Sequence, residues 1–331
     1  MEMRRLPPDA AARLLCVLAI ALAAAACGDS STPTQTTPPP VDARLIAFTS
    51  DSDNAPLDGS DGKGGSSIFT MHADGTHKSR LTSAHFLDAN PSWSPDGSSI
   101  AFESSRSPAG IWIMNGDGSN QRPFLTDAAF ESPTELRWSP DGHSIAFDAY
   151  ADNISSVRVI MIANADGSRA HRLTTNVNGE QWPSWSPDGS RIAFMAISGP
   201  LGYSVFVANS DGSGQRQLTF GADGQPAWSP DGAHIAFVSF DDSNHPQIFV
   251  MSDDGSDQRA LTTGGINTAP AWSPDSKQLV FERNTSDAAP DSPLEIFRMN
   301  ADGSDVRAIT SRGPTGGAST QSWSPVWKPT P

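Results

Sequence analysis

Residues 91–97 read Pro-Ser-Trp-Ser-Pro-Asp-Gly, and the chain repeats this phrase with small changes. The first proline has no backbone donor, which suits the start of a strand, and the tryptophan offers a large area for burial. Ser-Pro-Asp-Gly is turn chemistry, because proline presets φ and glycine accepts a positive φ. The tryptophans of the six copies are Trp93, Trp138, Trp185, Trp228, Trp272 and, in a copy without Asp-Gly, Trp327.

Three further phrases recur in a fixed order after each tryptophan. They are Ile-Ala-Phe, an apolar strand that runs into Asp-Gly, and Leu-Thr or its equivalent, and the Asp-Gly pair predicts a hairpin. Each repeat therefore predicts four strands, A (Trp), B (Ile-Ala-Phe), C (before Asp-Gly) and D (Leu-Thr). The B strands end at Phe48, Phe102, Phe147, Phe194, Phe237 and Phe281, and the Asp-Gly aspartates are Asp74, Asp117, Asp166, Asp211, Asp254 and Asp302.

The spacing of the tryptophans, 45, 47, 43, 44 and 55 residues, decides between repeat architectures. A period in the forties built from four short apolar stretches is typical of propeller blades and not of helical repeats. The 28 glycines and 27 prolines suit many short strands joined by tight turns. The sequence predicts an all-β fold, a six-bladed β-propeller of four-stranded antiparallel blades over residues 44–331.

The two ends of the repeat series predict how the ring closes. The first strand is a B strand, 45–48, followed by C and D strands, whereas the last is an A strand, 325–328. Pairing the C-terminal A strand with the N-terminal B, C and D strands completes one blade and removes two exposed edges. We therefore expect a closed ring.

These phrases, together with Met-Asn-Ala-Asp-Gly-Ser around Asp302, resemble the repeat of TolB propellers over about residues 44–329. The resemblance implies the propeller fold. A TolB-type protein also carries a small α/β domain ahead of its propeller, and this chain has only a Pro/Thr-rich stretch there. A role in envelope integrity, and binding of a peptidoglycan-associated lipoprotein, are implied only as possibilities.

The N-terminus predicts export. Basic residues precede an apolar run, 14–26, which is too short to span a bilayer and ends Ala-Ala-Ala-Cys. This resembles the lipobox of bacterial lipoproteins, in which Cys27 would be lipidated after removal of residues 1–26; the alternative is an ordinary secretory signal. Residues 27–43, rich in Ser, Thr and Pro, then form a tether. We expect a lipid anchor on the extracytoplasmic side of a bacterial membrane.

Charge and cysteine content limit the partners. The formal net charge is −15, with acidic residues spread along the chain, so nucleic acid is not an expected partner and membrane contact is expected only through the lipid. The two cysteines, Cys16 and Cys27, lie in or next to the signal, so no disulfide is expected in the propeller. A monomer is expected.

Strand order divides the predicted loops between two faces. The A–B and C–D turns are short and nearly identical, whereas the B–C and D–A connections on the other face vary. Binding residues usually lie on irregular loops, so the variable-loop face and its channel mouth are the predicted functional surface. Residues just before each A strand should meet there and suit a peptide or a sugar, unless they only contact water. They are Asn90, Glu135, Trp182, Gln225 and Ala269.

Two other candidates carry charge. Arg137 stands where the other repeats have Ser, Ala or Val, and it is expected to pair with Glu135 or Glu131, an anion-binding role being the alternative. The B–C segment 51–65 contains Asp51, Asp53, Asp58 and Asp61 among glycines, which could bind Ca²⁺ or could belong to a solvated loop. Pro56 occupies the glycine position of an EF-hand, and no other cofactor is expected.

No catalytic motif is found, neither Gly-x-Ser-x-Gly nor His-Glu-x-x-His. The aspartates of Ser-Pro-Asp-Gly recur in blade after blade, which indicates turn geometry. The leading hypothesis is a non-catalytic, envelope-anchored scaffold that binds a protein or peptide through the variable-loop face. The alternative is a carbohydrate-binding or carbohydrate-degrading propeller that uses a divalent cation, because TolB-like propellers also resemble those of some pectin-degrading lyases.

Overall fold

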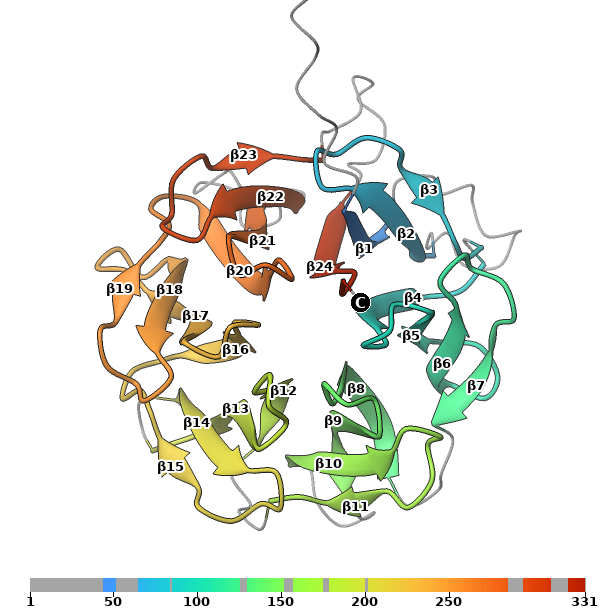
Figure 1. The fold of residues 1–331 in the computed structure, drawn as a ribbon, viewed down its shortest axis with the longest axis horizontal. Coiled ribbons are helices and arrows are strands. Elements are labelled where there is room, and N and C mark those ends of the chain that lie inside the picture. Colours follow the sequence, from blue (N-terminus) through green and yellow to red (C-terminus); the bar gives the residue numbers. More distant parts are fainter. Residues whose placement is uncertain are drawn as a thin grey trace, which may run out of the picture. The chain divides into compact units, whose positions relative to one another are not determined.

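The computed structural model describes residues 44–51, 65–83, 85–125, 130–151, 157–174, 179–199, 202–284, 294–310 and 321–330. They form six antiparallel four-stranded sheets arranged as blades around a ring (Figure 1). In each blade strand A lies nearest the centre and strand D lies outermost. The six-bladed propeller expected from the repeats is confirmed. In these ranges there is no helix long and apolar enough to cross a membrane.

The first three blades follow the order A, B, C, D from the inside outward. Blade 1 consists of β24 (Ser322–Trp327), β1 (Leu45–Ser50), β2 (Ser67–His72) and β3 (Ser79–Arg80). Blade 2 consists of β4 (Asp88–Trp93), β5 (Ser99–Ser104), β6 (Gly110–Asn115) and β7 (Arg122–Leu125). Blade 3 consists of β8 (Phe130–Trp138), β9 (Ser144–Ala151), β10 (Arg158–Asn164) and β11 (His171–Arg172).

The remaining blades have the same order, and their D strands are short. Blade 4 consists of β12 (Gln181–Trp185), β13 (Arg191–Ile197), β14 (Tyr203–Asn209) and β15 (Arg216–Gln217). Blade 5 consists of β16 (Gly224–Trp228), β17 (His234–Phe240), β18 (Pro246–Ser252) and β19 (Arg259–Ala260). Blade 6 consists of β20 (Ile266–Trp272), β21 (Gln278–Asn284), β22 (Glu295–Asn300) and β23 (Arg307–Ala308).

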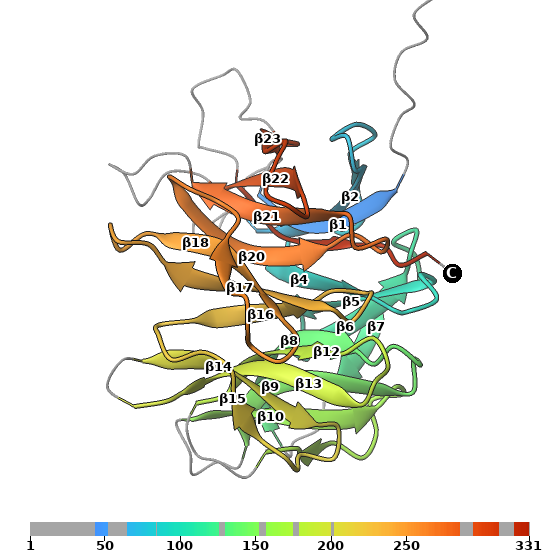
Figure 2. The same ribbon diagram turned by 60° about the vertical axis from the view of Figure 1, so that its left-hand side comes forward.

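The ring closes in blade 1, as the two incomplete ends predict. Strand β24 pairs antiparallel with β1, with Ile46 opposite Trp327 and Ser50 opposite Ser322. The chain then leaves β24 beside the turn between β4 and β5, where Lys328 Nζ lies 5.1 Å from the centre of the Trp93 ring. Figure 2 marks this end of the chain with a C. The last residues therefore contact blade 2 as well as blade 1.

The core is built from the B strands and the tryptophans. The Ile-Ala-Phe phenylalanines are among the largest fully buried side chains, and each contributes about 1.5–3 kcal/mol on burial. The tryptophans lie between blades, because the indole N–H of Trp185 donates to the Arg137 carbonyl of blade 3 (3.2 Å) and that of Trp272 to the Ala227 carbonyl of blade 5 (3.0 Å). The buried phenylalanines are Phe48, Phe102, Phe147, Phe194, Phe237 and Phe281.

The Asp-Gly turns hold neighbouring blades close together. Gly212 has a φ of +82°, and a Cβ at this position would lie 2.1 Å from the Leu173 carbonyl oxygen of the preceding blade. Any other residue would be strained there and would push the two blades apart. In the Leu-Thr phrase, the Thr219 hydroxyl accepts the Val205 N–H at 2.9 Å, which fixes the end of strand D to strand C.

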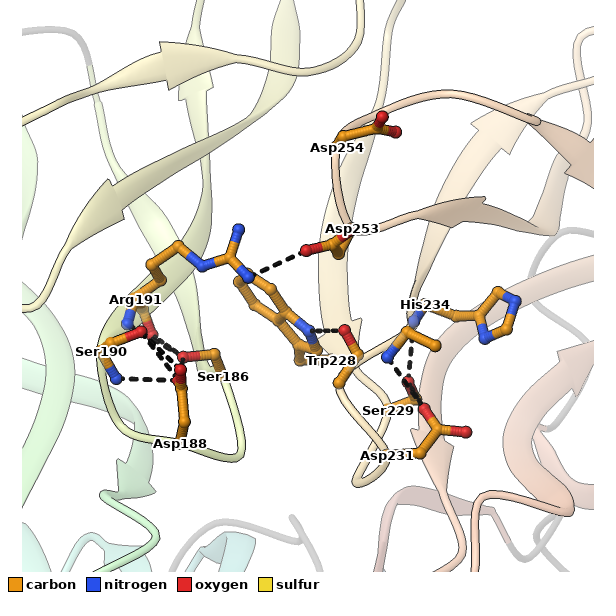
Figure 3. Close-up of polar contacts among 12 residues, drawn as sticks. Ser186, Asp188, Ser190, Arg191, Trp228, Ser229, Asp231, His234, Asp253 and Asp254 are labelled. Atoms are coloured by element: carbon orange, nitrogen blue, oxygen red, sulfur yellow. Dashed lines mark hydrogen bonds and ion pairs between the residues drawn. The ribbon is translucent and has the colours of Figure 1, made fainter.

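The Ser-Pro-Asp-Gly turns share one hydrogen-bond pattern. In blade 4 the Ser186 hydroxyl donates to Asp188 Oδ1 at 2.6 Å, and the same carboxylate oxygen accepts the Ser190 N–H at 3.0 Å (Figure 3). Next to this turn, Arg191 extends toward blade 5, where its Nη2 lies 2.9 Å from Asp253 Oδ2 and its Cζ 4.7 Å from the centre of the Trp228 ring. The turn and the arginine together join blades 4 and 5.

Candidate functional site

Six equivalent residues of the A strands form a ring around the channel, and we call them the channel ring. All are non-glycine residues with a positive φ, between 50° and 59°, and the pairing of strands A and B shifts in register around them in each blade. Each is therefore part of a β-bulge. The channel ring consists of Asn90, Glu135, Trp182, Gln225, Ala269 and Ser324.

This arrangement corrects the expected position of five of these residues. They lie within strands β4, β8, β12, β16 and β20 and not just before them, because pairing with strand B resumes on both sides of each bulge. The sixth member, Ser324, was missed by the sequence reasoning. It could have been found by counting back three residues from the incomplete Trp327 phrase, as for the others.

In five of the six blades the bulge donates a backbone hydrogen bond to the blade before it. The Glu135 N–H donates to Glu103 Oε1 of blade 2 at 3.1 Å, and the Ser324 N–H donates to Glu282 Oε1 of blade 6 at 2.7 Å. The Asn90 N–H likewise donates to the Thr49 hydroxyl of blade 1 at 3.1 Å. A positive φ costs a non-glycine residue about 1–2 kcal/mol, which these hydrogen bonds offset in part.

The channel ring lies at one end of a cavity of about 230 Å³. The wall next to it is formed by the residues two positions further along each A strand, which include Ser92, Arg137 and Ser184. Beyond them lie the tryptophans, and a second cavity of about 370 Å³ continues to the prolines of the A–B turns. The turn prolines are Pro95, Pro140, Pro187 and Pro230, and Pro329 of the C-terminal segment lines the same cavity.

The cavity therefore extends toward the A–B turns, whereas the binding residues were expected on the variable-loop face. The described residues that line it come from the A strands, the A–B turns and the C-terminal segment, not from the variable B–C and D–A loops. The physical reason is that the repeated tryptophans and prolines serve two purposes. Their outer atoms pack between blades, and their remaining surface lines the channel.

Arg137 and Glu135 are in contact inside the channel, as expected from their spacing. Arg137 Nη2 lies 3.2 Å from Glu135 Oε2, and the arginine side chain keeps 30% of its surface exposed. Burial raises the pKa of Glu135 to about 8, since the neighbouring arginine only partly counteracts it. Among the described residues that line the two cavities, Arg137 is the only lysine or arginine.

Three more carboxylates lie behind the channel ring, and the sequence reasoning did not identify them. Glu103, Asp148 and Glu282 each follow the phenylalanine of an Ile-Ala-Phe phrase. Burial raises the pKa of all three carboxyl groups, although Asp148 is paired with Arg158. The available signal was an acidic residue after this phenylalanine in three repeats only, which indicates a role that differs between blades.

The turn aspartates have the opposite environment. The hydroxyl of Ser186 and the N–H of Ser190 lower the pKa of Asp188 to about 2, and the corresponding groups lower the pKa of Asp96. These carboxylates are held by their own turns, so the interpretation of Ser-Pro-Asp-Gly as turn geometry agrees with the structure. Within the described ranges, no three His, Cys, Asp or Glu side chains are grouped so that they could hold a metal ion.

The remaining predicted residues are only partly described. The Asp51 carboxylate accepts the Gln321 N–H next to the closing strand, and burial raises its pKa. Asp53, Asp58 and Asp61, and Cys27 with the expected signal and tether, lie outside the described residues. The Glu131 side chain also lies outside them, so of the two expected partners of Arg137 only Glu135 can be assessed.

Comparison with known proteins agrees with this architecture. Three solved structures are similar to this chain, and their low sequence identities show a shared fold only. TolB from Acinetobacter baumannii has a TM-score of 0.71 at 18% identity, over 87% of this chain and 67% of that chain. A protein from Agrobacterium tumefaciens assigned as TolB has a TM-score of 0.63 at 21% identity, over 87% and 99%. Hydrazine synthase from Kuenenia stuttgartiensis has a TM-score of 0.65 at 17% identity, over 90% of this chain and 50% of that chain.

A family model gives the stronger result, because it matches most of the chain. The model described as the TolB beta propeller domain matches residues 46–221 and 160–329, which together contain all six blades. The matched range starts in β1 and ends just after β24, so it includes the channel ring and both cavities. The chain belongs to the TolB beta propeller domain family.

Proposed function

We propose that this protein is a non-catalytic scaffold of the bacterial cell envelope, which binds a protein or peptide partner in the channel. The observation that carries the proposal is the channel itself, whose walls are tryptophans and prolines around one partly exposed arginine. Tryptophan and arginine are enriched among the residues that dominate binding energies at protein interfaces. Aromatic walls also suit extended, proline-containing segments.

The charges of the channel support a peptide with both polar and apolar groups. Arg137 can donate to a carbonyl or carboxylate of the partner, since its pairing with Glu135 leaves part of its surface accessible. Glu135 is mainly protonated at pH 7, because its pKa is about 8, and can then donate a hydrogen bond. A partner therefore meets hydrogen-bond donors at the channel-ring end of the cavity and apolar rings toward the A–B turns.

Binding should be tested with the full chain and an envelope extract. We compare Arg137→Ser, which introduces the residue that blades 2 and 4 carry at this position, with Arg307→Ser on the outer strand β23. The expected result is a captured protein whose affinity falls at least tenfold for Arg137→Ser and is unchanged for Arg307→Ser. Equal binding by both variants would exclude the channel, and capture of glycans instead of protein would favour the carbohydrate alternative.

The envelope location is a separate part of the proposal and has its own test. It is supported by the apolar run that ends Ala24-Ala25-Ala26-Cys27 and by the bacterial origin of two similar propellers. Replacing Cys27 by Ser in the full chain should move the protein from the membrane fraction to the soluble fraction. If the variant stays with membranes after a salt wash, the lipid anchor is wrong, while binding in the channel is unaffected.

A further inference from the structure

A separate cavity lies outside the channel, between blades 4 and 5, at a place where the repeat changes locally. The residue after the B-strand phenylalanine is polar in four blades, but it is Met195 in blade 4 and Val238 in blade 5. The facing residue of β16 is Gly224, where a Cβ would lie 2.8 Å from the Met195 sulfur. Apolar side chains and a glycine thus replace the polar contacts that join the other blades.

We call this space, about 390 Å³, the apolar hollow. Its walls include Met195, Tyr203, Val238, Phe240 and Pro246, at the ends of β13 and β17 and the starts of β14 and β18. These strand ends adjoin the B–C connections, so the hollow belongs to the variable-loop face and not to the A–B turn face. Its volume lies within the range of about 300–1,000 Å³ typical of small ligand sites.

Exposed apolar side chains occur in the apolar hollow and close to its lining residues along the chain. Phe240, which lines it, keeps 44% of its surface exposed, and Ile197 at the end of β13 keeps 41%. Phe220 is 74% exposed and precedes the lining residue Ala222 by two positions. Exposed apolar groups that lie close together on a protein surface are typical of a contact site for another molecule.

The charge at this site is negative. Asp223 lines the apolar hollow, and the loop between its lining residues Phe240 and Pro246 carries Asp241 and Asp242. The Asp241 carboxylate accepts the His245 N–H, which lowers its pKa and keeps it ionised at neutral pH. None of the described lining residues is a lysine or arginine. A matching ligand therefore combines an apolar group with a positive charge.

We propose that the apolar hollow binds one aromatic or branched aliphatic side chain of a peptide, flanked by lysine or arginine. The apolar side chain fills the space beside Met195 and Val238, and the basic neighbours meet Asp241 and Asp242. This site lies outside the channel and is independent of the binding proposed there. The two sites adjoin at Gln225, which lines both and whose Oε1 accepts the Ala269 N–H at 2.8 Å.

The test uses three fluorescein-labelled peptides, Gly-Lys-Trp-Lys-Gly, Gly-Glu-Trp-Glu-Gly and Gly-Lys-Ala-Lys-Gly, with the full chain. Fluorescence anisotropy should show binding of the first, at least tenfold weaker binding of the other two, and further weakening of the first by salt. Absence of binding by the first peptide, or equal binding of all three, would overturn the proposal.

Variants locate the site. Ala222→Trp fills the apolar hollow from an exposed position, and Ala233→Trp is its control in the A–B turn of the same blade. The first should weaken binding of Gly-Lys-Trp-Lys-Gly at least tenfold and the second should not; equal affinities would refute the site. Phe240→Ser gives a second measurement if Ala222→Trp does not fold. Arg137→Ser should leave binding of this peptide unchanged. This result would distinguish a failure of the apolar-hollow proposal from a failure of the channel proposal.

Discussion

Two sets of carboxylates occur in the same repeats and have opposite properties. The turn aspartates, such as Asp188 and Asp211, are exposed, accept hydrogen bonds from their own turns and have lowered pKa values. The channel carboxylates Glu135, Asp148 and Glu282 are buried and have raised pKa values. Acids that recur in nearly every blade maintain geometry. Acids present in only some blades make the parts of the channel chemically different from one another.

The strongest test of this contrast is Asp148→Ala. It leaves Arg158 without the partner that it contacts between β9 and β10, and breaking a buried ion pair costs about 3–5 kcal/mol. Urea unfolding should show this loss, with a smaller one for Asp148→Asn, whose amide oxygen can still accept. A loss for Asp148→Ala no larger than that of a turn aspartate would mean that the two sets do not differ in energy.

Glu135→Gln should reveal the raised pKa as a pH effect on stability. The folded protein keeps this proton up to about pH 8, whereas the unfolded chain releases it near pH 4.5. Between these values the unfolded state binds fewer protons, so wild-type stability falls as pH rises from about 5 to 8. At about 1.4 kcal/mol per pKa unit, less some solvent screening, the variant should be roughly 2–4 kcal/mol more stable than wild type at pH 9 and similar at pH 5.

Thermal unfolding of the Glu135→Gln variant and wild type at pH 5, 7 and 9 measures this difference. Asp166→Asn serves as the control, because it neutralises an exposed turn aspartate with a lowered pKa. The control should follow the wild-type profile over this range. Parallel profiles for Glu135→Gln and wild type would show that Glu135 is ionised in the folded protein, contrary to its buried position.

Whereas Glu135→Gln should raise the stability of the protein at high pH, Asp188→Ala should lower it moderately. It removes the acceptor for the Ser186 hydroxyl and the Ser190 N–H, which should cost about 1 kcal/mol in urea unfolding at pH 7. Because its folded pKa is about 2 and its ordinary value is 3.8, this stabilisation is present above pH 3.8 and is lost as pH falls through 2. A difference from wild type that persists undiminished at pH 2 would contradict this assignment.

Asp211→Asn should have the smallest effect. Its side-chain oxygen can still accept the Ser213 N–H, which Asp211 accepts at 2.9 Å, and the position is exposed. No change in the urea midpoint is expected between pH 5 and 9. A clear loss would show that the charge itself, and not the hydrogen-bond geometry, is required in the turns.

The repeated phrases made most of the fold predictable. Turn chemistry, buried phenylalanines and the incomplete Trp327 phrase are local signals, so blade number, strand order and closure could all be read from the sequence. Five of the six channel-ring residues were identified from the sequence, but their place within the A strands and their conformation were not. Asn90, Trp182 and Ala269 share no preference for a positive φ, and their bulges depend on partners in the preceding blade or on the neighbouring strand.

The direction of the cavity and the acids behind the channel ring were not predictable in the same way. Glu103 occupies an ordinary half-buried strand position in β5. Its role follows from a contact with another blade, because it accepts the Glu135 N–H of blade 3. The sequence predicted that the tryptophans bury a large area, and Trp185 and Trp272 do so against carbonyl groups of the preceding blades. That they also line the channel follows from the arrangement of all six blades around it, which no single repeat encodes.

Strand β24 has a consequence for the order of folding. Its partner β1 is made first, yet Ser50 and Ser322 are separated by 272 positions, so blade 1 stays incomplete until the last segment has been synthesised. Joining such distant segments adds little entropy cost, about 0.6 kcal/mol per doubling of loop length, but contacts of this range form slowly. A chain interrupted before residue 322 would expose β1 as an open strand edge, and such shortened products should be prone to aggregation.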